Sequence, residues 1–174
     1  MFSTRVAFTV TVCVALITPA WSGHTLTSQE QRILETWLAR HPKFRVATDA
    51  DCGCAEHIQQ MRAGDGGEWN PVPDYHPYAA TGDFNGDGVA DFAIVVIDPS
   101  KSVKDFTLLV FNGPFGSKAT SPAFVEPGLR GQALFFGPPR PKPFRLVVGP
   151  FNSDNSAILV PHGRTYKLQE DEED

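Results

Sequence analysis

The sequence lacks a basic stripe, a second long apolar run and a recognisable nucleophile motif. Its 15 Lys and Arg residues are outnumbered by 20 Asp and Glu residues, and the isoelectric point is about 5.5, which argues against a nucleic-acid partner. Beyond the N-terminus, no segment is apolar enough to span a membrane. No motif such as G-x-S-x-G marks a nucleophile, so no catalytic residues are predicted.

The N-terminus is predicted to be a secretory signal peptide over residues 1–22. Arg5 supplies a basic start, residues 6–18 are apolar and nearly free of charge, and small residues stand at Ala20 and Ser22. The apolar run is short for a bilayer core of ~30 Å, although a membrane anchor is the alternative. Cleavage after Ser22 removes Arg5 and changes the formal net charge from -5 to -6. We therefore predict a periplasmic or secreted protein with no membrane span after cleavage.

Residues 23–169 are predicted to form a single α+β domain, followed by a solvated acidic tail over residues 170–174. Helices are expected over Ser28 to His41, with Ser28 as the cap, and over about Asp51 to Ala63. Short apolar runs between Gly, Pro, Asn and Ser then indicate strands joined by hairpins. The expected strands lie near residues 92–98, 105–111, 132–136, 144–148, 157–161 and 164–168. We therefore predict N-terminal helices packed on a mainly antiparallel meander sheet.

One stretch, TGDFNGDGVADFAIVV at residues 81–96, places oxygen-bearing side chains at alternate positions directly before a run of β-forming residues. Alternate side chains of a tight loop can converge on one centre, and Gly86 and Gly88 permit the turn. Counted from Asp83 as position 1, the pattern supplies oxygens at positions 1, 3, 5, 7 and 9. The predicted ligands are the side chains of Asp83, Asn85, Asp87 and Asp91 and the backbone carbonyl of Val89.

The chemistry of these ligands favours calcium. Three carboxylates this close together repel one another unless a cation lies among them. Ca²⁺ is a hard cation that takes six to eight oxygen ligands, whereas Mg²⁺ demands a tighter octahedron. Zn²⁺ would normally recruit Cys or His, which the loop lacks. The sequence therefore predicts a calcium site, and the alternative is an acidic β-turn without an ion.

The loop differs from an EF-hand, because position 12 is Ile94 instead of Glu and a β run follows instead of a helix. In entering a strand, GDFNGDGVADFAIVV resembles the calcium loops of FG-GAP and VCBS repeats, of the kind found in integrin α-subunit propeller blades. The resemblance covers about 16 residues and implies Ca²⁺ at the five positions above. One intact loop is too little for a full propeller, so a single isolated copy of the unit is expected.

Removal of the signal peptide leaves only two cysteines, Cys52 and Cys54, as Cys-Gly-Cys. An oxidising compartment would let them pair in a very small ring, and a structural disulfide is the favoured interpretation. With His57, the two cysteines also allow a redox or soft-metal site, and free thiols are a third possibility.

One further group of residues has the raw material of a catalytic site. Asp74, Tyr75 and His76 follow Glu68 and Trp69, and a His beside a carboxylate can act as a general base. Packing of this Pro-rich loop over a sheet edge is the favoured interpretation. We therefore predict an exported, calcium-stabilised, non-enzymatic module that binds an envelope or extracellular protein or glycan. The alternative is a small extracytoplasmic enzyme, either a hydrolase or a thiol-redox protein.

Overall fold

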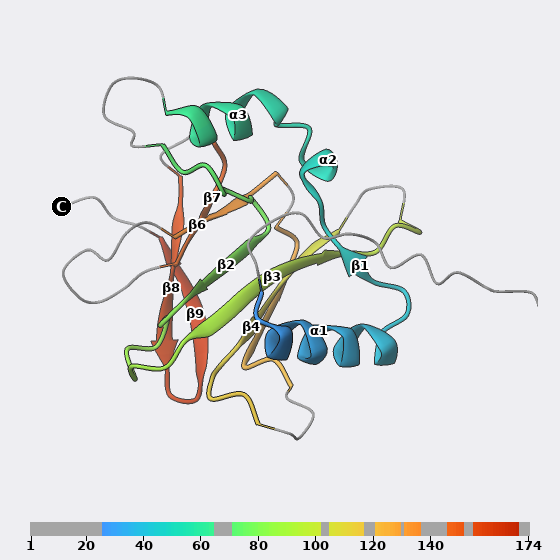
Figure 1. Ribbon diagram of the computed structural model, residues 1–174, viewed down its shortest axis with the longest axis vertical. Helices are drawn as coiled ribbons and strands as arrows, with labels where there is room; N and C mark the ends of the chain where they lie inside the picture. Colours follow the sequence, from blue (N-terminus) through green and yellow to red (C-terminus); the bar gives the residue numbers. More distant parts are fainter. Residues whose placement is uncertain are drawn as a thin grey trace, which may run out of the picture.

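The computed structural model describes residues 26–64, 71–101, 105–116, 121–129, 131–136, 146–151 and 155–170. The predicted signal peptide, Glu68, Trp69 and tail residues 171–174 lie outside the described residues. The described chain is mixed α and β and rich in strands (Figure 1). In chain order its elements are α1 (Ser28–Arg40), β1 (Arg45–Val46), α2 (Asp49–Cys52), α3 (Ala55–Ala63), β2 (Ala79–Gly82), β3 (Asp91–Ile97), β4 (Phe106–Phe111), β5 (Phe124–Pro127), β6 (Ala133–Phe135), β7 (Leu146–Gly149), β8 (Ala157–His162) and β9 (Thr165–Glu170).

These strands form two antiparallel sheets, whereas the sequence predicts one. The first sheet has the order β1-β3-β4-β5, with β2 also paired to β3, and the second is a meander, β6-β7-β8-β9. β1 and β2 share one edge of β3, because β1 pairs with its C-terminal end and β2 with its N-terminal end. β5 ends at Pro127, which has no N–H for a further ladder, and the chain then leaves the first sheet.

Helix α1 begins one residue earlier than its predicted cap implies. Thr27, and not Ser28, is the N-cap, and Thr27 and Glu30 bond each other in a capping box. The second predicted helix is divided into α2 and α3 at Gly53, whose left-handed φ of 69° favours glycine. Among the described residues no helix is both long enough and apolar enough to cross a membrane.

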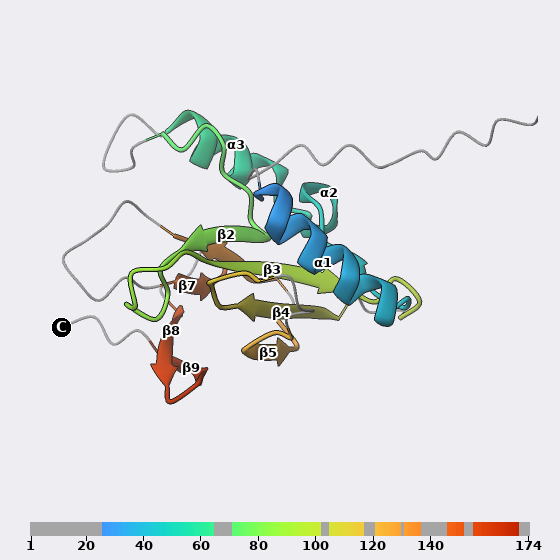
Figure 2. The ribbon, with the colours of Figure 1, turned by 60° about the horizontal axis from the view of Figure 1, so that its bottom comes forward.

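Strand β3 is buried along its whole length and contributes to two hydrophobic clusters. Phe92, Ile94 and Val96 belong to a cluster with Ile33 and Leu34 of α1. The intervening β3 residues belong to a cluster with side chains of the second sheet. Figure 2 shows β3 in the middle of the molecule, with α1 on one side and β7 to β9 on the other. The loop that precedes β3 is therefore attached to the most buried element of the described chain.

Candidate functional site

The predicted calcium loop joins the paired strands β2 and β3. Gly82 and Asp91 are partners in that pairing, so residues 83–90 close a hairpin at one end of the first sheet (light green, Figure 1). Phe84, the second loop residue, is 1% exposed and lies in the cluster shared with the second sheet. Its ring meets Phe136 edge-on, with ring centroids 5.2 Å apart. The loop is thus anchored in the core while the side chain of Asp87 remains exposed.

Asp83 organises the loop backbone. Its Oδ1 accepts hydrogen bonds from the amides of Gly86 and Asp87 at 2.7 and 3.1 Å, and its Oδ2 accepts one from Gly88 at 2.8 Å. Gly86 and Gly88 have φ values of 76° and 85°, which a residue with a Cβ adopts only with strain. The alternation of acidic residues and glycine is therefore needed for the loop's conformation.

Asn85 and Asp87 fold back on the loop in the same way. Asn85 Oδ1 accepts from the amide of Asp87, and Asp87 Oδ1 accepts from the amide of Val89, both at 2.8 Å. Asn85 Nδ2 donates to Asp87 Oδ2 at 3.0 Å. Four of the five predicted ligands are therefore local to one compact turn, and each side-chain oxygen is positioned by a bond to the backbone or to its neighbour.

Asp91 differs from the other predicted ligands, because its carboxylate is fully buried and connects separate elements. Oδ2 accepts from the amide of Phe84 at 3.0 Å and lies 3.2 Å from the hydroxyl of Tyr166 in β9. Oδ1 accepts from the amide of Gly113, just after β4, at 2.9 Å. The Tyr166 hydroxyl also lies 2.7 Å from Asn112 Oδ1. One side chain thus joins the loop, the end of β4 and the second sheet.

The electrostatics at Asp91 reflect this burial. Burial raises the pKa of Asp91, the hydrogen bonds from Gly113, Phe84 and Tyr166 act in the opposite direction, and the charge of Asp87 adds to the rise. The pKa of Tyr166 is also raised, first by burial and then by the charge of Asp91. Gly113 and Tyr166 were missed by sequence reasoning, since they lie 22 and 75 residues beyond Asp91 and carry no local signal.

The donor set of the loop fits a hard cation, because it offers oxygen and neither sulfur nor imidazole. None of the four ion pairs among the described residues includes Asp83, Asp87 or Asp91. In the described chain, no three His, Cys, Asp or Glu side chains are arranged as a metal-holding group. Asp91, turned toward Gly113 and Tyr166, is the carboxylate that stands apart from the other two.

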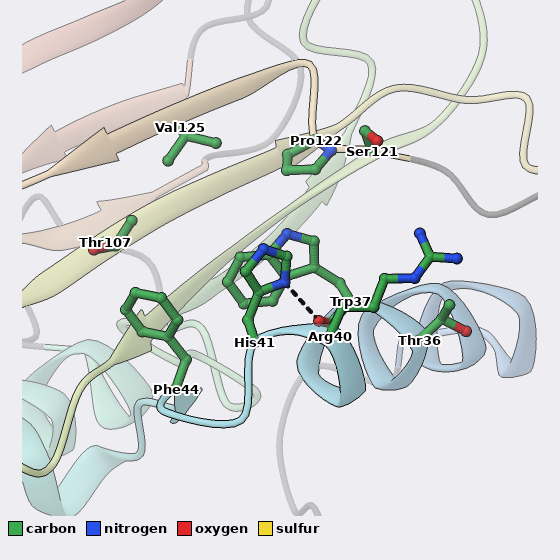
Figure 3. Close-up of a pocket in the computed structure, with 9 residues that line it drawn as sticks. All are labelled: Thr36, Trp37, Arg40, His41, Phe44, Thr107, Ser121, Pro122 and Val125. Atoms are coloured by element: carbon green, nitrogen blue, oxygen red, sulfur yellow. Dashed lines mark hydrogen bonds between the residues drawn. The ribbon is translucent and has the colours of Figure 1, made fainter.

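A second candidate site is a groove of about 440 Å³ between the C-terminal end of α1 and strands β4 and β5 (Figure 3). The rings of Trp37 and His41 are stacked, with centroids 4.0 Å apart, and His41 Nδ1 lies 2.8 Å from the Trp37 carbonyl. Phe44 continues this aromatic surface, 5.5 Å from Trp37. Val125, on the opposite side, is 50% exposed. The groove combines aromatic rings with an exposed aliphatic side chain and the guanidinium of Arg40.

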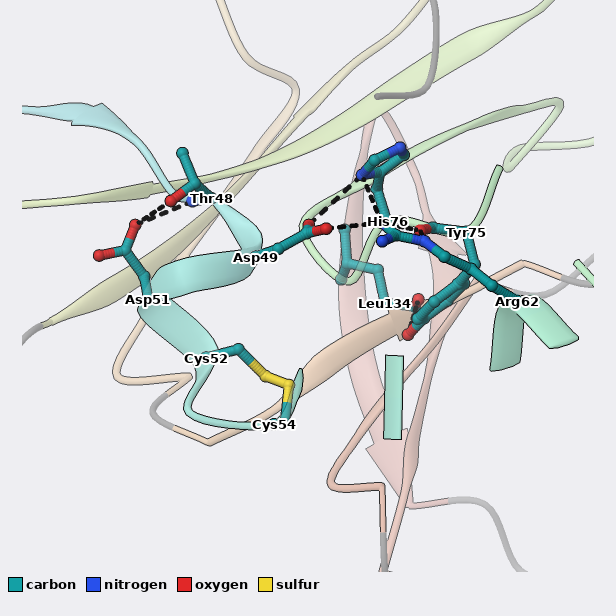
Figure 4. A network of polar contacts seen from close by, with 9 residues as sticks. All are labelled: Thr48, Asp49, Asp51, Cys52, Cys54, Arg62, Tyr75, His76 and Leu134. Carbon is teal, nitrogen blue, oxygen red and sulfur yellow. Dashed lines mark hydrogen bonds and ion pairs between the residues drawn. A yellow bond between two sulfur atoms is a disulfide. The ribbon is translucent and has the colours of Figure 1, made fainter. Parts of the chain in front are cut away.

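The predicted Asp74-Tyr75-His76 group is only partly brought together. His76 Nδ1 lies 3.3 Å from Asp49 Oδ1 of α2 (Figure 4). Asp74, in contrast, is exposed. Tyr75 is buried, and its hydroxyl donates to the Leu134 carbonyl at 3.1 Å. Burial, first of all, raises the pKa of Tyr75 above its ordinary value. The carboxylate that accompanies His76 is therefore one that the sequence did not indicate.

Arg62 of α3 completes this polar cluster. Its Nη2 lies 2.5 Å from Asp49 Oδ2 and donates to the Tyr75 carbonyl at 2.8 Å. The cluster thereby ties α2, α3 and the segment before β2 together (Figure 4). Close by, the sulfur atoms of Cys52 and Cys54 lie at disulfide distance.

No family model, curated protein or solved structure matches the chain.

Proposed function

We propose that the protein is a periplasmic or secreted, non-enzymatic module that is stabilised by one calcium ion and binds another envelope or extracellular molecule, a protein or a glycan. The observation that carries the proposal is that Asp83 and Asp87 lie in one short loop, with Asp91 at its end, and that none of the three has an ion-pair partner among the described residues. The N-terminal signal and the FG-GAP-like spacing support the same conclusion.

The loop residues would act together on the ion. Ca²⁺ supplies the positive charge that offsets the repulsion between these carboxylates. Asp83, Asn85 and Asp87 would bind it through side-chain oxygens and Val89 through its carbonyl. Asp91 Oδ1 accepts one hydrogen bond, from Gly113, and so keeps a second lone pair for the ion. The site would hold the hairpin between β2 and β3 in one conformation, which is a structural role.

We also infer that this loop is used outside a propeller. The shared clusters of α1 with β3 and of β3 with the second sheet favour an α+β module in which the N-terminal helices cover one face of a mainly antiparallel sheet. A propeller blade would repeat the loop around an axis, whereas here a single loop stands at one end of the first sheet.

The calcium site predicts a metal-dependent melting temperature. At a calcium concentration 100 times the dissociation constant, linkage is worth about 2.7 kcal/mol, which for a domain of this size corresponds to roughly 5–10 °C. Asp83→Asn should remove most of this increment, because Asp83 organises the loop backbone. Asp74→Asn is the matched control, because Asp74 is exposed and outside the loop. The measurement is differential scanning calorimetry of chelated protein during calcium titration, and an unchanged melting temperature would rule the site out.

The aromatic groove is where we place the partner contact. Val125→Ser removes an exposed aliphatic side chain from the groove and should reduce recovery of the partner from envelope extract. Val72→Ser is the matched control, because Val72 is the other large hydrophobic residue that is exposed in the described chain. The comparison is a quantitative pull-down with wild type and both variants, with and without chelator. Equal recovery with the two variants would exclude the groove.

A further inference from the structure

The Cys52–Cys54 pair lies in a turn whose geometry favours thiol–disulfide exchange over stabilisation of the fold. Cys52 is the last residue of α2, Cys54 is the N-cap of α3, and only Gly53 lies between them (Figure 4). Both cysteines are half-buried, and Gly53 is exposed with no atom within 4 Å of an added Cβ. The turn is therefore exposed at Gly53, and both cysteine side chains are partly accessible to solvent, although Cys52 also packs against the core cluster.

As a covalent constraint the bridge contributes little. The stabilisation that a disulfide gives by restricting the unfolded chain grows with the length of the loop it closes. With a sequence separation of two, the Cys52–Cys54 bridge restricts the unfolded chain less than almost any other disulfide would. Bridges between such near neighbours are also strained and are therefore more easily reduced than structural disulfides.

The start of α3 stabilises one product of reduction. Helix α3 has nine residues, and no side chain caps its N-terminus. A helix N-terminus presents free amide groups and a partial positive charge, which stabilise a cysteine thiolate. Cys54, once released from the bridge, stands at the position where its sulfur can accept hydrogen bonds from these amides. Stabilisation of the reduced form makes a disulfide a stronger oxidant.

The surrounding contacts hold the two cysteines in place when the bridge opens. Arg62 of α3 is ion-paired with Asp49 of α2, and Arg45 is ion-paired with Asp51 at 2.7 Å. Ring stacking of His57 on Phe151, with centroids 5.4 Å apart, fixes the first turn of α3. The two helices are thus joined independently of the sulfur–sulfur bond.

We propose that Cys52 and Cys54 form a redox-active pair that oxidises dithiols of other exported proteins by disulfide exchange. A substrate thiolate attacks Cys52 Sγ, the Sγ–Sγ bond breaks, and Cys54 leaves as a thiolate at the start of α3. The second substrate thiolate then attacks the substrate sulfur of the mixed disulfide, and Cys52 leaves as a thiolate. The substrate loses two electrons and becomes a disulfide, the pair becomes a dithiol, and the two substrate protons pass to solvent or to the released cysteines.

The cycle needs an oxidant, which we assign to the class of low-molecular-weight disulfides such as oxidised glutathione. Two exchange steps with such a molecule restore the Cys52–Cys54 bridge and release two small thiols. This activity would add an enzymatic role, at the Cys52–Cys54 turn, to the calcium-dependent binding module, which is otherwise non-enzymatic, and it does not depend on the ion.

The first test measures the equilibrium of the mature wild-type protein with reduced and oxidised glutathione. We expect its bridge to be at least about 100-fold easier to reduce than a structural disulfide such as those of native ribonuclease A. Oxidised wild-type protein should also convert about one equivalent of a reduced dithiol peptide to its disulfide, whereas the double variant Cys52→Ser, Cys54→Ser should convert none. A bridge that stays oxidised beside the ribonuclease control, or no peptide oxidation, would overturn the proposal.

The second test examines the role of the helix start and leaves both cysteines unchanged. Glu56→Gln removes the acidic charge of the first turn of α3, so the Cys54 thiolate gains stability and the bridge should become about two- to fivefold easier to reduce. Glu35→Gln, an exposed position of α1, is the matched control and should leave the equilibrium unchanged. An equal effect of the two substitutions, or a shift toward the oxidised form with Glu56→Gln, would contradict the stabilisation of the Cys54 thiolate by the start of α3.

Discussion

At the scale of single residues, Asp91 has the most demanding environment in the candidate site. A buried carboxylate is stable only when donors or charges replace the water it has lost. Asp91 has the amides of Phe84 and Gly113 and the hydroxyl of Tyr166, and each comes from a different part of the chain. Asp91 is therefore both the predicted ligand at position 9 of the loop and the side chain that connects the loop to β9 and to the turn after β4.

Tyr166→Phe tests the anchoring role. The substitution removes one of the three donors to the Asp91 carboxylate, so the free energy of unfolding should fall by about 1–2 kcal/mol. It should also reduce the calcium-dependent increment, because Asp91 loses a contact that orients it. Tyr75→Phe is the matched control, since its hydroxyl donates to the Leu134 carbonyl, away from the loop. Urea unfolding with and without calcium measures both effects, and an equal calcium increment in the two variants would limit Tyr166 to a packing role.

At the scale of elements, the proposed calcium loop and the turn after β4 fit closely together. Gly113 donates its amide to Asp91 and leaves no space for a side chain. A Cβ at this position would lie 2.5 Å from the Ala90 carbonyl oxygen and 2.6 Å from Val89 Cγ1. The loop and the turn therefore depend on each other's backbone positions.

Gly113→Ala should disturb both elements at once. Overpacking against the backbone of Ala90 should lower the free energy of unfolding by about 1–3 kcal/mol. Gly116→Ala is the matched control three residues away, where an added Cβ meets no atom within 4 Å. It should change the stability by less than about 0.5 kcal/mol. The measurement is the free energy of unfolding of the two variants in urea. Equal values would show that the turn accommodates the added Cβ at Gly113 without loss of stability.

The elements that the sequence predicted are those with a strong local pattern. The apolar runs predicted β3 and β4 to within one residue at either end, because both strands are buried throughout. β1, β2 and β5 were missed, since two to four residues of mixed composition become strands only by pairing with a neighbour. The division into two sheets has the same origin, because it depends on contacts between distant segments.

The candidate site follows the same division between local and distant contacts. The alternation from Asp83 to Val89 is local, so the residues that form the compact turn could be chosen from the sequence alone. The contacts of Asp91 with Gly113 and Tyr166 arise only when β4 and β9 are assembled around β3. No spacing rule in the sequence could indicate them.

At the scale of the whole molecule, the proposed calcium loop lies at the junction of the two sheets. Phe84 packs in the cluster shared by both sheets, and Asp91, the first residue of β3, bonds to Gly113 just after β4 and to Tyr166 of β9. Ile33 and Leu34 of α1 lie in the other cluster, with alternate residues of β3. Order in the loop should therefore affect the junction of the sheets more than it affects the contact between α1 and β3.

Hydrogen exchange with and without chelator tests this unequal coupling. Removal of calcium should increase exchange at residues 83–91, at Gly113 and in β9 around Tyr166, because carboxylate repulsion then loosens the turn that holds Asp91. The amides of α1 around Ile33 should keep their protection, since none of the predicted ligands belongs to the hydrophobic cluster of Ile33 and Leu34. A uniform rise would mean that calcium sets only global stability, and unchanged protection in the loop would mean that the turn is rigid without the ion. Either result would contradict the unequal coupling of the loop to the two hydrophobic clusters.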